Sequence, residues 1–288
     1  MQTAARGARQ LVQNTAERLA CAGVPEPVAS AEVLLAELLG VRRSELTLRE
    51  ELLTDDEAVL YEAWISRRLV REPVQRILGY AYFRNLRLKL DEHTLIPRPD
   101  TENVVDAVLE AVDRRADFCR VLDLATGSGA IAVSVAQECP YCEVHATDHS
   151  ESALKNARRN AARTGVTVRF YRADLASGLD ALAGSIQVLV SNPPYIKSAD
   201  IPKLAPEVRD WDPRSALDGG PDGLDFYRRI FTEAAPLLVD GADVVLEVGD
   251  GQTDAVLELG GRAGYEPLGT QPDLTGTARA ALLRWGSG

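Results

Sequence analysis

The chain has 288 residues, enough for one large domain and a smaller one. Apolar residues make up 45% and charged residues 26%, which is typical of a globular protein and excludes a disordered or collagen-like chain. The 32 basic and 43 acidic side chains give a net charge of −11, which argues against binding long nucleic acid by neutralising its phosphates. Without an apolar run of roughly 20 residues or a signal peptide, the chain is expected to be cytoplasmic and without membrane contact.

Residues 1–79 have the periodicity of helices. Pro27 suits the first turn of one helix and Gly40 its end. Thr54 and Glu57 have the spacing of a capping box and predict the start of another helix. The residues expected on the inner faces are Leu11, Val12, Thr15, Ala16, Leu19, Ala20, Leu34, Leu35, Leu38, Leu39, Leu60, Trp64 and Ile65. These helices predict a small N-terminal bundle.

Residues 80–97 change to a period of two, which predicts a linking β-hairpin with a turn at 84–85 or 91–92. From residue 98 to 288 helices and strands alternate, which is typical of an α/β fold with a mostly parallel, Rossmann-like sheet covered on both faces. The expected helices cover 101–115, 130–138, 151–163, 223–235 and 252–262, and the expected strands cover 120–125, 142–148, 166–171, 186–191, 242–248 and 278–285.

Cys139 and Cys142 have the spacing of a dithiol redox site. In such a site the pair precedes a helix, whose dipole lowers the thiol pKa, whereas this pair follows a predicted helix and precedes a strand. The position favours a plain turn between helix and strand. Adding His145 would still leave a zinc site one ligand short, so no metal is expected.

The first candidate binding site is the stretch 121–130, an apolar strand that runs into a glycine-rich turn before a helix. Open parallel sheets bind their ligands at this place. Gly127 and Gly129 would let a ligand approach the backbone closely, because they carry no Cβ. Asp123, at the end of the strand, would repel a phosphate but attract the ammonium or sulfonium group of S-adenosylmethionine (AdoMet).

Two further acidic residues follow later strands. Asp148 stands nineteen residues after Gly129, where a carboxylate can bind both hydroxyls of a ribose. Asp174, after the third strand, suits either the amino group of adenine or solvent. The ribose contact would serve NAD as well as AdoMet, and Gly127, Gly129 and Ala132 match a loose dinucleotide fingerprint.

Asn192, Pro193, Pro194 and Tyr195 follow an apolar strand and should lie at the same edge of the sheet as the glycine turn. The side-chain oxygen of Asn192 and the carbonyl of Pro193 can accept both N–H donors of a planar amide or amine, and the consecutive prolines stiffen the backbone. Tyr195 would supply a flat wall for the planar group. A nitrogen held in this way would face the AdoMet methyl, which predicts N-methyl transfer.

Taken together, these motifs resemble the HemK-type peptide chain release factor glutamine methyltransferases over nearly the whole chain. Besides 192–195, the family-like strings cover 71–79, 95–102, 123–132, 152–161, 212–220 and 222–228. The strings 95–102 and 212–220 discriminate best, because Asn-Pro-Pro-Tyr also occurs in adenine-amine DNA methyltransferases.

The resemblance implies a seven-stranded AdoMet-dependent methyltransferase sheet with a reversed last strand, and an N-terminal bundle that docks the substrate protein. That partner would be a class 1 release factor, methylated on the side-chain amide of the glutamine in its Gly-Gly-Gln loop, without a direct nucleic-acid partner. The substrate glutamine would bind at 192–195. The AdoMet contacts carried over by resemblance are Ala125, Thr126, Gly127, Ser128, Gly129, Asp148, Leu175 and Asn192.

Three positions depart from the family pattern. Ala125 replaces the first glycine of the turn, and its methyl group is tolerable only if φ stays negative. Arg76 and Leu175 stand at positions that are often aromatic, and at Leu175 the change would loosen adenine stacking.

Three other functions compete with protein methylation. A drifted copy of the family would methylate the nitrogen of a small amide or amine. An NAD-binding oxidoreductase would need a proton donor near the nicotinamide, and His93, His145 and His149 are poorly placed for that role. A module that binds AdoMet without transferring its methyl group would not need Asn192.

Overall fold

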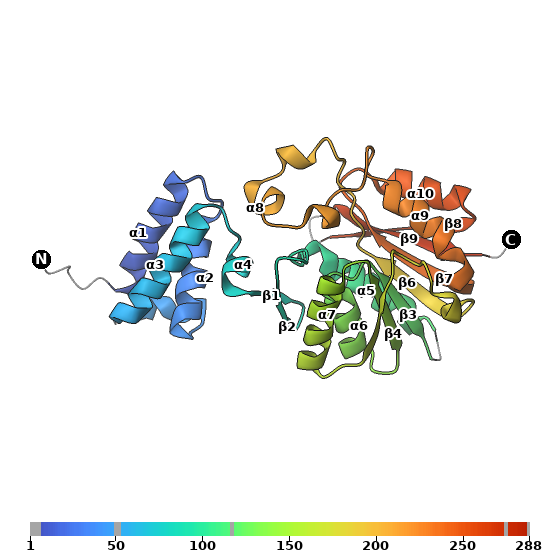
Figure 1. The fold of residues 1–288 in the computed structure, drawn as a ribbon, viewed down its shortest axis with the longest axis horizontal. Coiled ribbons are helices and arrows are strands. Elements are labelled where there is room, and N and C mark those ends of the chain that lie inside the picture. Colours follow the sequence, from blue (N-terminus) through green and yellow to red (C-terminus); the bar gives the residue numbers. More distant parts are fainter. Residues whose placement is uncertain (1–6, 49–52, 116–117, 274–275, 287–288) are drawn as a thin grey trace, which may run out of the picture. The chain divides into compact units, whose positions relative to one another are not determined.

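The computed structural model describes residues 7–48, 53–115, 118–273 and 276–286. It divides into two units (Figure 1). One holds residues 1–79 together with 206–211, and the other holds 80–205 and 212–288. None of the described helices is both long and apolar enough to cross a membrane.

The N-terminal unit is the expected helical bundle. Its helices are α1 (Ala8–Cys21), α2 (Pro27–Leu39), η1 (Arg43–Leu48), α3 (Asp55–Leu69), α4 (Val74–Leu78) and α8 (Pro206–Arg209). Pro27 occupies the first turn of α2, and Gly40 ends that helix in the left-handed conformation at φ 63°. At the start of α3 the backbone N–H of Thr54 donates to Glu57 at 2.8 Å, and the Glu57 N–H donates to the Thr54 hydroxyl at 3.3 Å. The capping box is therefore confirmed.

Two residues that were predicted to face the core of the bundle face solvent instead. Tyr61 and Ile65 fill the interior from α3, whereas Leu60 is 44% exposed. Ala20 is exposed as well, next to the buried Leu19. Neighbouring residues on a helix point about 100° apart, so once Tyr61 and Leu19 face the core the adjacent residue turns toward solvent.

Residues 206–211 contact the helices of this unit through a partly buried ion cluster. The Glu207 carboxylate accepts hydrogen bonds from Arg68 at 3.0 Å and from Arg71 at 2.6 Å. Arg68 is only 4% exposed, and burial lowers its pKa although Glu207 opposes the shift. The two guanidinium groups compensate one partly buried carboxylate, which would be costly to desolvate without a partner.

The second unit begins with the expected hairpin, formed by β1 (Tyr80–Phe83) and β2 (Leu86–Lys89). The turn of the hairpin lies at 84–85, and a further turn at 92–93 follows the second strand. The helices that follow are α5 (Asp100–Asp113), α6 (Ala130–Glu138), α7 (Glu151–Thr164), α9 (Asp225–Glu233) and α10 (Thr253–Arg262). Short 3₁₀ segments are η2 (Asp180–Leu182), η3 (Ile201–Lys203), η4 (Arg214–Ala216) and η5 (Ala235–Leu237).

Seven strands form the main sheet in the order β5-β4-β3-β6-β7-β9-β8. They are β3 (Arg120–Leu124), β4 (Glu143–Asp148), β5 (Val168–Arg172), β6 (Ile186–Ser191), β7 (Leu238–Glu247), β8 (Tyr265–Pro272) and β9 (Ala278–Trp285). The last strand, β9, runs antiparallel to both neighbours, as the resemblance implied. The periodicity missed β8, because Pro267, Gly269 and Pro272 interrupt it and only Tyr265 is buried.

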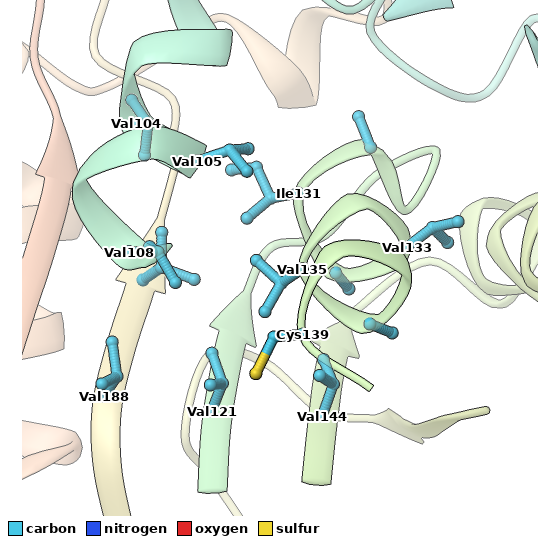
Figure 2. Packing of buried hydrophobic residues seen from close by; sticks show 14 of the residues in the cluster. Val104, Val105, Val108, Val121, Ile131, Val133, Val135, Cys139, Val144 and Val188 are labelled. Carbon is cyan, nitrogen blue, oxygen red and sulfur yellow. The ribbon is translucent and has the colours of Figure 1, made fainter. Parts of the chain in front are cut away.

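Apolar side chains pack on both faces of this sheet. Alternate residues of a strand point to opposite faces, so Val121 and Leu122 of β3 belong to different core clusters. Helices α5 and α6 cover one face and α9 and α10 the other (Figure 1). Figure 2 shows the first face, where valines of α5 and α6 approach Val121, Val144 and Val188 of the strands. This packing holds the ends of β3, β4 and β6 level with one another.

The segment between α6 and β4 carries one correction. Cys139 and Cys142 lie in the turn expected there, but their sulfur atoms are joined in a disulfide, so the segment is not a plain turn. The Nδ1 of His145 lies 3.0 Å from the Tyr171 hydroxyl. No group of side chains suited to a metal ion occurs among the described residues.

Candidate active site

A cavity of about 920 Å³, counted with its open mouth, lies at the carboxyl ends of β3, β4 and β6. The lining residues are His93, Thr94, Leu95, Pro97, Thr101, Ala125, Thr126, Gly127, Ser128, Ala130, Ile131, Asp148, His149, Ser150, Ala153, Ala173, Asp174, Leu175, Asn192, Pro194, Ser215, Ala216 and Phe226. The glycine turn and the Asn-Pro-Pro-Tyr segment therefore meet at one cavity, as their positions after parallel strands predict.

The glycine turn adopts left-handed backbone at three alternate positions. Gly127 has φ 57° and Gly129 has φ 81°. A Cβ on Gly129 would stand 3.0 Å from Cβ of Ala157, so the absence of a side chain there lets α6 pack closely against α7. Gly129 is thus a packing residue and does not line the cavity.

Ala125 is the third of these positions, with φ 57°. The sequence predicted a negative φ at Ala125 if its methyl group is to be tolerated, and the structure has a positive φ there. An L-residue in this region is strained by roughly 1–2 kcal/mol, because Cβ approaches the following carbonyl oxygen. Leu175, a second departure from the family pattern, also has a positive φ of 53°. Both strained residues line the cavity.

Asp148 ends β4 with its carboxylate held by the neighbouring backbone. Its Oδ2 accepts from the Gly127 N–H at 2.9 Å, and its Oδ1 accepts from the Ser150 N–H at 2.9 Å. Each carboxylate oxygen can accept a second hydrogen bond. The oriented carboxylate at the cavity wall therefore suits a ribose with two neighbouring hydroxyls.

Asp123 occupies a different place from the one expected. Its side chain is 1% exposed and is not among the residues that line the cavity. Burial and, to a smaller extent, the nearby Asp148 raise the pKa of this carboxyl to about 7, although hydrogen bonds from the Thr126 hydroxyl and the Ala132 N–H oppose the shift. The Thr126 hydroxyl donates to Oδ2 at 2.5 Å, so Asp123 supports the turn from below.

Asp174 and Leu175 follow β5 and line the cavity side by side. Leu175 is buried, whereas the Asp174 side chain is 60% exposed and pairs with Arg229 at 3.0 Å. An apolar wall of this kind suits the face of an adenine ring. The exposed ion pair leaves lone pairs on the Asp174 carboxylate, so this side chain can contact either the adenine amino group or solvent.

The Asn-Pro-Pro-Tyr segment begins directly after β6. Asn192 and Pro194 line the cavity, whereas the buried Pro193 and the half-buried Tyr195 do not. The Asn192 side chain donates from Nδ2 to the Thr101 hydroxyl at 3.2 Å. Tyr195 packs against the core and directs its hydroxyl to Oε1 of Glu247 at 3.5 Å, so its ring is not the cavity wall expected from the sequence.

Residues far along the chain support this segment from behind. The Gln252 side chain donates to the Tyr195 carbonyl at 2.9 Å and accepts from the Gly249 N–H at 3.0 Å. A Cβ on Gly219 would stand 2.8 Å from the Pro194 carbonyl oxygen. Sequence reasoning assigned no role to Gln252 or Gly219, although the glycines of 219–223 signal that backbone passes close to another segment.

Glu247, at the end of β7, is the second buried acid near the cavity. It is 2% exposed, and burial raises its pKa to about 7. Its Oε2 has no hydrogen-bond partner among the described residues. Burial also raises the pKa of Tyr195, and the Glu247 charge adds to that shift. No motif of the sequence pointed to Glu247, because its relation to the cavity depends on how β7 pairs with β6.

Comparison with known proteins identifies the family. Residues 10–79 match the family model described as the PrmC N-terminal domain, and residues 103–207 match the methyltransferase small domain. Three relatives are named release factor glutamine methyltransferase. They come from Agrobacterium fabrum (39% identical, covering 93% of this chain and 94% of the relative), Deinococcus radiodurans (40%, 97% and 99%) and Streptomyces coelicolor (42%, 95% and 96%).

Solved structures agree with the fold. A methyltransferase from Pyrococcus furiosus superposes with a TM-score of 0.50 at 21% identity, covering 81% of this chain and 98% of that one. The catalytic domain of hMettl16, solved with an RNA hairpin, gives 0.54 at 15% identity, covering 81% and 82%. At these identities the likeness concerns the fold alone. The near full-length sequence relatives carry the assignment, and this chain belongs to the release factor glutamine methyltransferase family, whose methyl donor is AdoMet.

Proposed function

We propose that this protein transfers a methyl group from AdoMet to the side-chain amide nitrogen of the glutamine in the Gly-Gly-Gln loop of class 1 release factors. The observation that carries the proposal is that Asp148 and Asn192 line the same cavity. The first offers a carboxylate for a ribose and the second an amide for a planar nitrogen. The relatives' name supports the choice of a release factor as substrate, and that substrate places the reaction in the cytoplasm.

The residues of the cavity fit AdoMet. Asp148 would hold the ribose, Leu175 would pack against the adenine, and the turn from Ala125 to Ser128 would hold the methionine end. Asp174 is placed to reach the adenine amino group. When bound, AdoMet supplies an electrophilic methyl group on a positively charged sulfur.

Asn192 and Pro193 would hold the substrate amide. Asn192 Oδ1 and the Pro193 carbonyl would each accept one N–H, which fixes the plane of the amide and points its nitrogen into the cavity. The N–C bond forms as the S–C bond breaks, and positive charge builds on the nitrogen next to these two oxygens. The nitrogen then loses one proton to water. A strong base is not required, because the proton becomes acidic only as the new bond forms.

The N-terminal unit would dock the release factor. It matches the family's own N-terminal model over residues 10–79, and it contains none of the residues that line the cavity. A separate docking surface suits a protein substrate better than a small molecule. The acidic net charge of −11 is also consistent with a protein partner.

Mass spectrometry of the modified protein tests the proposal. A class 1 release factor incubated with the enzyme and AdoMet should gain about 14 Da on its Gly-Gly-Gln peptide, the mass of one added methylene. The N192A variant should still bind AdoMet but leave the peptide unmodified. An unmodified release factor with the wild-type enzyme would contradict the proposal. Methylation of a small amide instead would point to a drifted family copy, and heat of binding with NAD but not AdoMet would point to an oxidoreductase.

A further inference from the structure

Helix α7 carries three exposed basic side chains in line. Lys155, Arg159 and Arg163 follow one another at intervals of four residues, so they lie on the same side of the helix. At 1.5 Å per residue, the line rises about 12 Å along the helix axis. The buried side of α7, which includes Leu154 and Ala157, packs against the protein. The three cations therefore face solvent.

A fourth basic side chain, that of Lys89 on β2, lies beside this line. Strand β2 runs next to α7 (Figure 1), because the Lys89 N–H donates to Asn160 Oδ1 at 2.7 Å and the Lys89 carbonyl accepts from Asn156 at 3.0 Å. The Lys89 side chain is exposed. We call these four cations, Lys89, Lys155, Arg159 and Arg163, the basic row.

The basic row lacks partners within the protein. None of its four charged groups has an ion pair or a hydrogen bond with another described residue. Other exposed arginines do have carboxylate partners, as Arg158 has in Glu151 at 3.0 Å and Arg214 has in Asp218 at 2.9 Å. The chain has 43 acidic and 32 basic side chains, so carboxylates are in excess. Unpaired cations on one face therefore leave a local positive field on an acidic protein.

Helix stability does not account for the basic row. Like charges four residues apart on a helix repel one another and destabilise it. Arg163 lies in the last turn, where the helix dipole favours a cation, but Lys155 lies in the second turn and gains nothing from the dipole. A partner outside the protein explains the arrangement better, because a carboxylate brought to the row would relieve the repulsion.

A surface depression links the basic row to the active-site cavity. Lys155 and Arg159 line the depression but not the cavity, so they can contact a substrate only away from its reacting group. His93 lines both hollows, which makes them neighbours at the surface. The residues around the depression are Asp91, Glu92, His93, Ser152, Lys155 and Arg159.

We propose that the basic row binds an acidic surface of the substrate protein, next to the loop that brings the glutamine into the cavity. This inference rests on the proposed function, because it adds a second contact for the same protein substrate. Exposed charges of this kind mainly speed the encounter of two proteins and set their orientation. The row therefore lowers KM for the protein substrate and leaves the methyl-transfer step unchanged.

Two observations favour a protein partner over a nucleic acid. The line on α7 rises only about 12 Å, whereas single-stranded nucleic acid is bound along a basic groove that follows its backbone. The depression also contains the carboxylates of Asp91 and Glu92, and the net charge is −11, so a continuous phosphate backbone would be repelled. Acidic side chains of a folded protein can meet the cations and avoid these carboxylates.

Removal of two charges from the row tests the inference. In K155Q/R159Q, KM for a class 1 release factor should rise about threefold to tenfold, the effect of two lost exposed ion pairs, while kcat stays within about twofold of the wild type. K155E/R159E should raise KM further, because it adds repulsion. The Kd for AdoMet, measured by isothermal titration, should not change in either variant, since neither residue lines the cavity.

R114Q/R262Q is the matched control. It removes two exposed positive charges as well, but from the ends of α5 and α10. These helices end close to where β3 and β8 begin, at the edge of the sheet opposite the cavity. Its KM should therefore equal that of the wild type. A rise in KM as large as in K155Q/R159Q would show that overall charge and not the basic row matters, and would overturn the inference.

The dependence on salt separates an electrostatic contact from a structural role. In the wild type, kcat/KM should fall as NaCl increases from about 0.05 M to about 0.3 M, because salt screens exposed charges. In K155E/R159E this fall should be smaller. A variant damaged in its fold would show a lower kcat/KM at every salt concentration with the same dependence, and circular dichroism would detect the damage.

The results also distinguish this inference from the proposed function. Wild-type KM and salt dependence in K155E/R159E would overturn the inference while methylation by the wild type stands. Binding of a single-stranded RNA of about 12 nucleotides that K155E/R159E loses, with KM for the release factor unchanged, would overturn it in favour of a nucleic-acid partner. Absence of methylation by the wild-type protein would instead contradict the proposed function.

Discussion

Gly219 lies directly behind Pro194, where a Cβ would stand 2.8 Å from the proline carbonyl oxygen and 2.8 Å from Cα of Tyr195. Both neighbours are backbone atoms and cannot rotate away. The Gly219 N–H also donates to the Ile196 carbonyl at 2.8 Å, which holds the two segments together. A residue 27 positions after Asn192 therefore sets the position of the segment that is proposed to hold the substrate amide.

G219A should lower both activity and stability. The methyl group must displace the segment around Pro194, and a shift of the acceptors by a fraction of an ångström misplaces the amide, so kcat should fall at least about tenfold. The free energy of unfolding should fall by about 1–3 kcal/mol, as for other overpacked sites. G261A is the control, because a Cβ there meets only Pro267 at 3.8 Å. Equal kcat in G219A and the wild type would show that the segment tolerates the shift.

A125G should relieve strain in the glycine turn. Glycine adopts φ 57° without the Cβ clash, so the free energy of unfolding should rise by about 0.5–1 kcal/mol and AdoMet should bind at least as tightly. A162G, at an exposed position in the last turn of α7, should instead lose up to about 1 kcal/mol of stability. Denaturant unfolding and isothermal titration measure both quantities. Destabilisation by A125G similar to that by A162G would mean that Ala125 carries no strain.

D148A should weaken AdoMet binding by about 1–3 kcal/mol, because it removes the acceptor for the ribose hydroxyls and leaves the Gly127 N–H unpaired. Isothermal titration gives the Kd for both proteins. D174A should have a smaller effect, since the Asp174 side chain is 60% exposed and paired with Arg229. An unchanged Kd in D148A would refute the ribose assignment.

D123N should flatten the dependence of stability on pH. The folded-state pKa of Asp123 is raised from 3.8 to about 7, so the native state holds this proton more tightly and stability falls as pH rises between these values. Asparagine cannot ionise, so in D123N the unfolding free energy should fall less between about pH 5 and pH 8, a range that includes the Asp123 pKa of about 7. The fall caused by ionisation of Glu247 should remain.

D200N is the control for this measurement. The hydrogen bond from Lys203 lowers the pKa of Asp200, so its stabilising effect is lost only as pH falls below the usual range of an aspartate. Its slope between pH 5 and pH 8 should match the wild type. The same slope in D123N would show that Asp123 is ionised throughout this range.

Local patterns were sufficient to place the two halves of the site. The apolar strands ending near Asp123 and Ser191, the glycine turn and the prolines after Asn192 are each visible within about ten residues. In a parallel sheet, strand ends share one edge, so the meeting of these segments at one cavity followed from the order of elements alone. The hairpin, the capping box at Thr54 and the reversed last strand were likewise predicted from sequence pattern or resemblance.

Tertiary structure decided the rest. Whether Asp123 faces the cavity or the space beneath the turn depends on how α6 packs over β3, and sequence spacing carries no information about that packing. Thr101, Gly219, Glu247 and Gln252 reach the Asn-Pro-Pro-Tyr segment only because strand register and helix packing bring distant residues together. The positive φ of Ala125 arises in the same way, since the closed turn, held by Asp148, imposes a backbone conformation that alanine would not choose by itself.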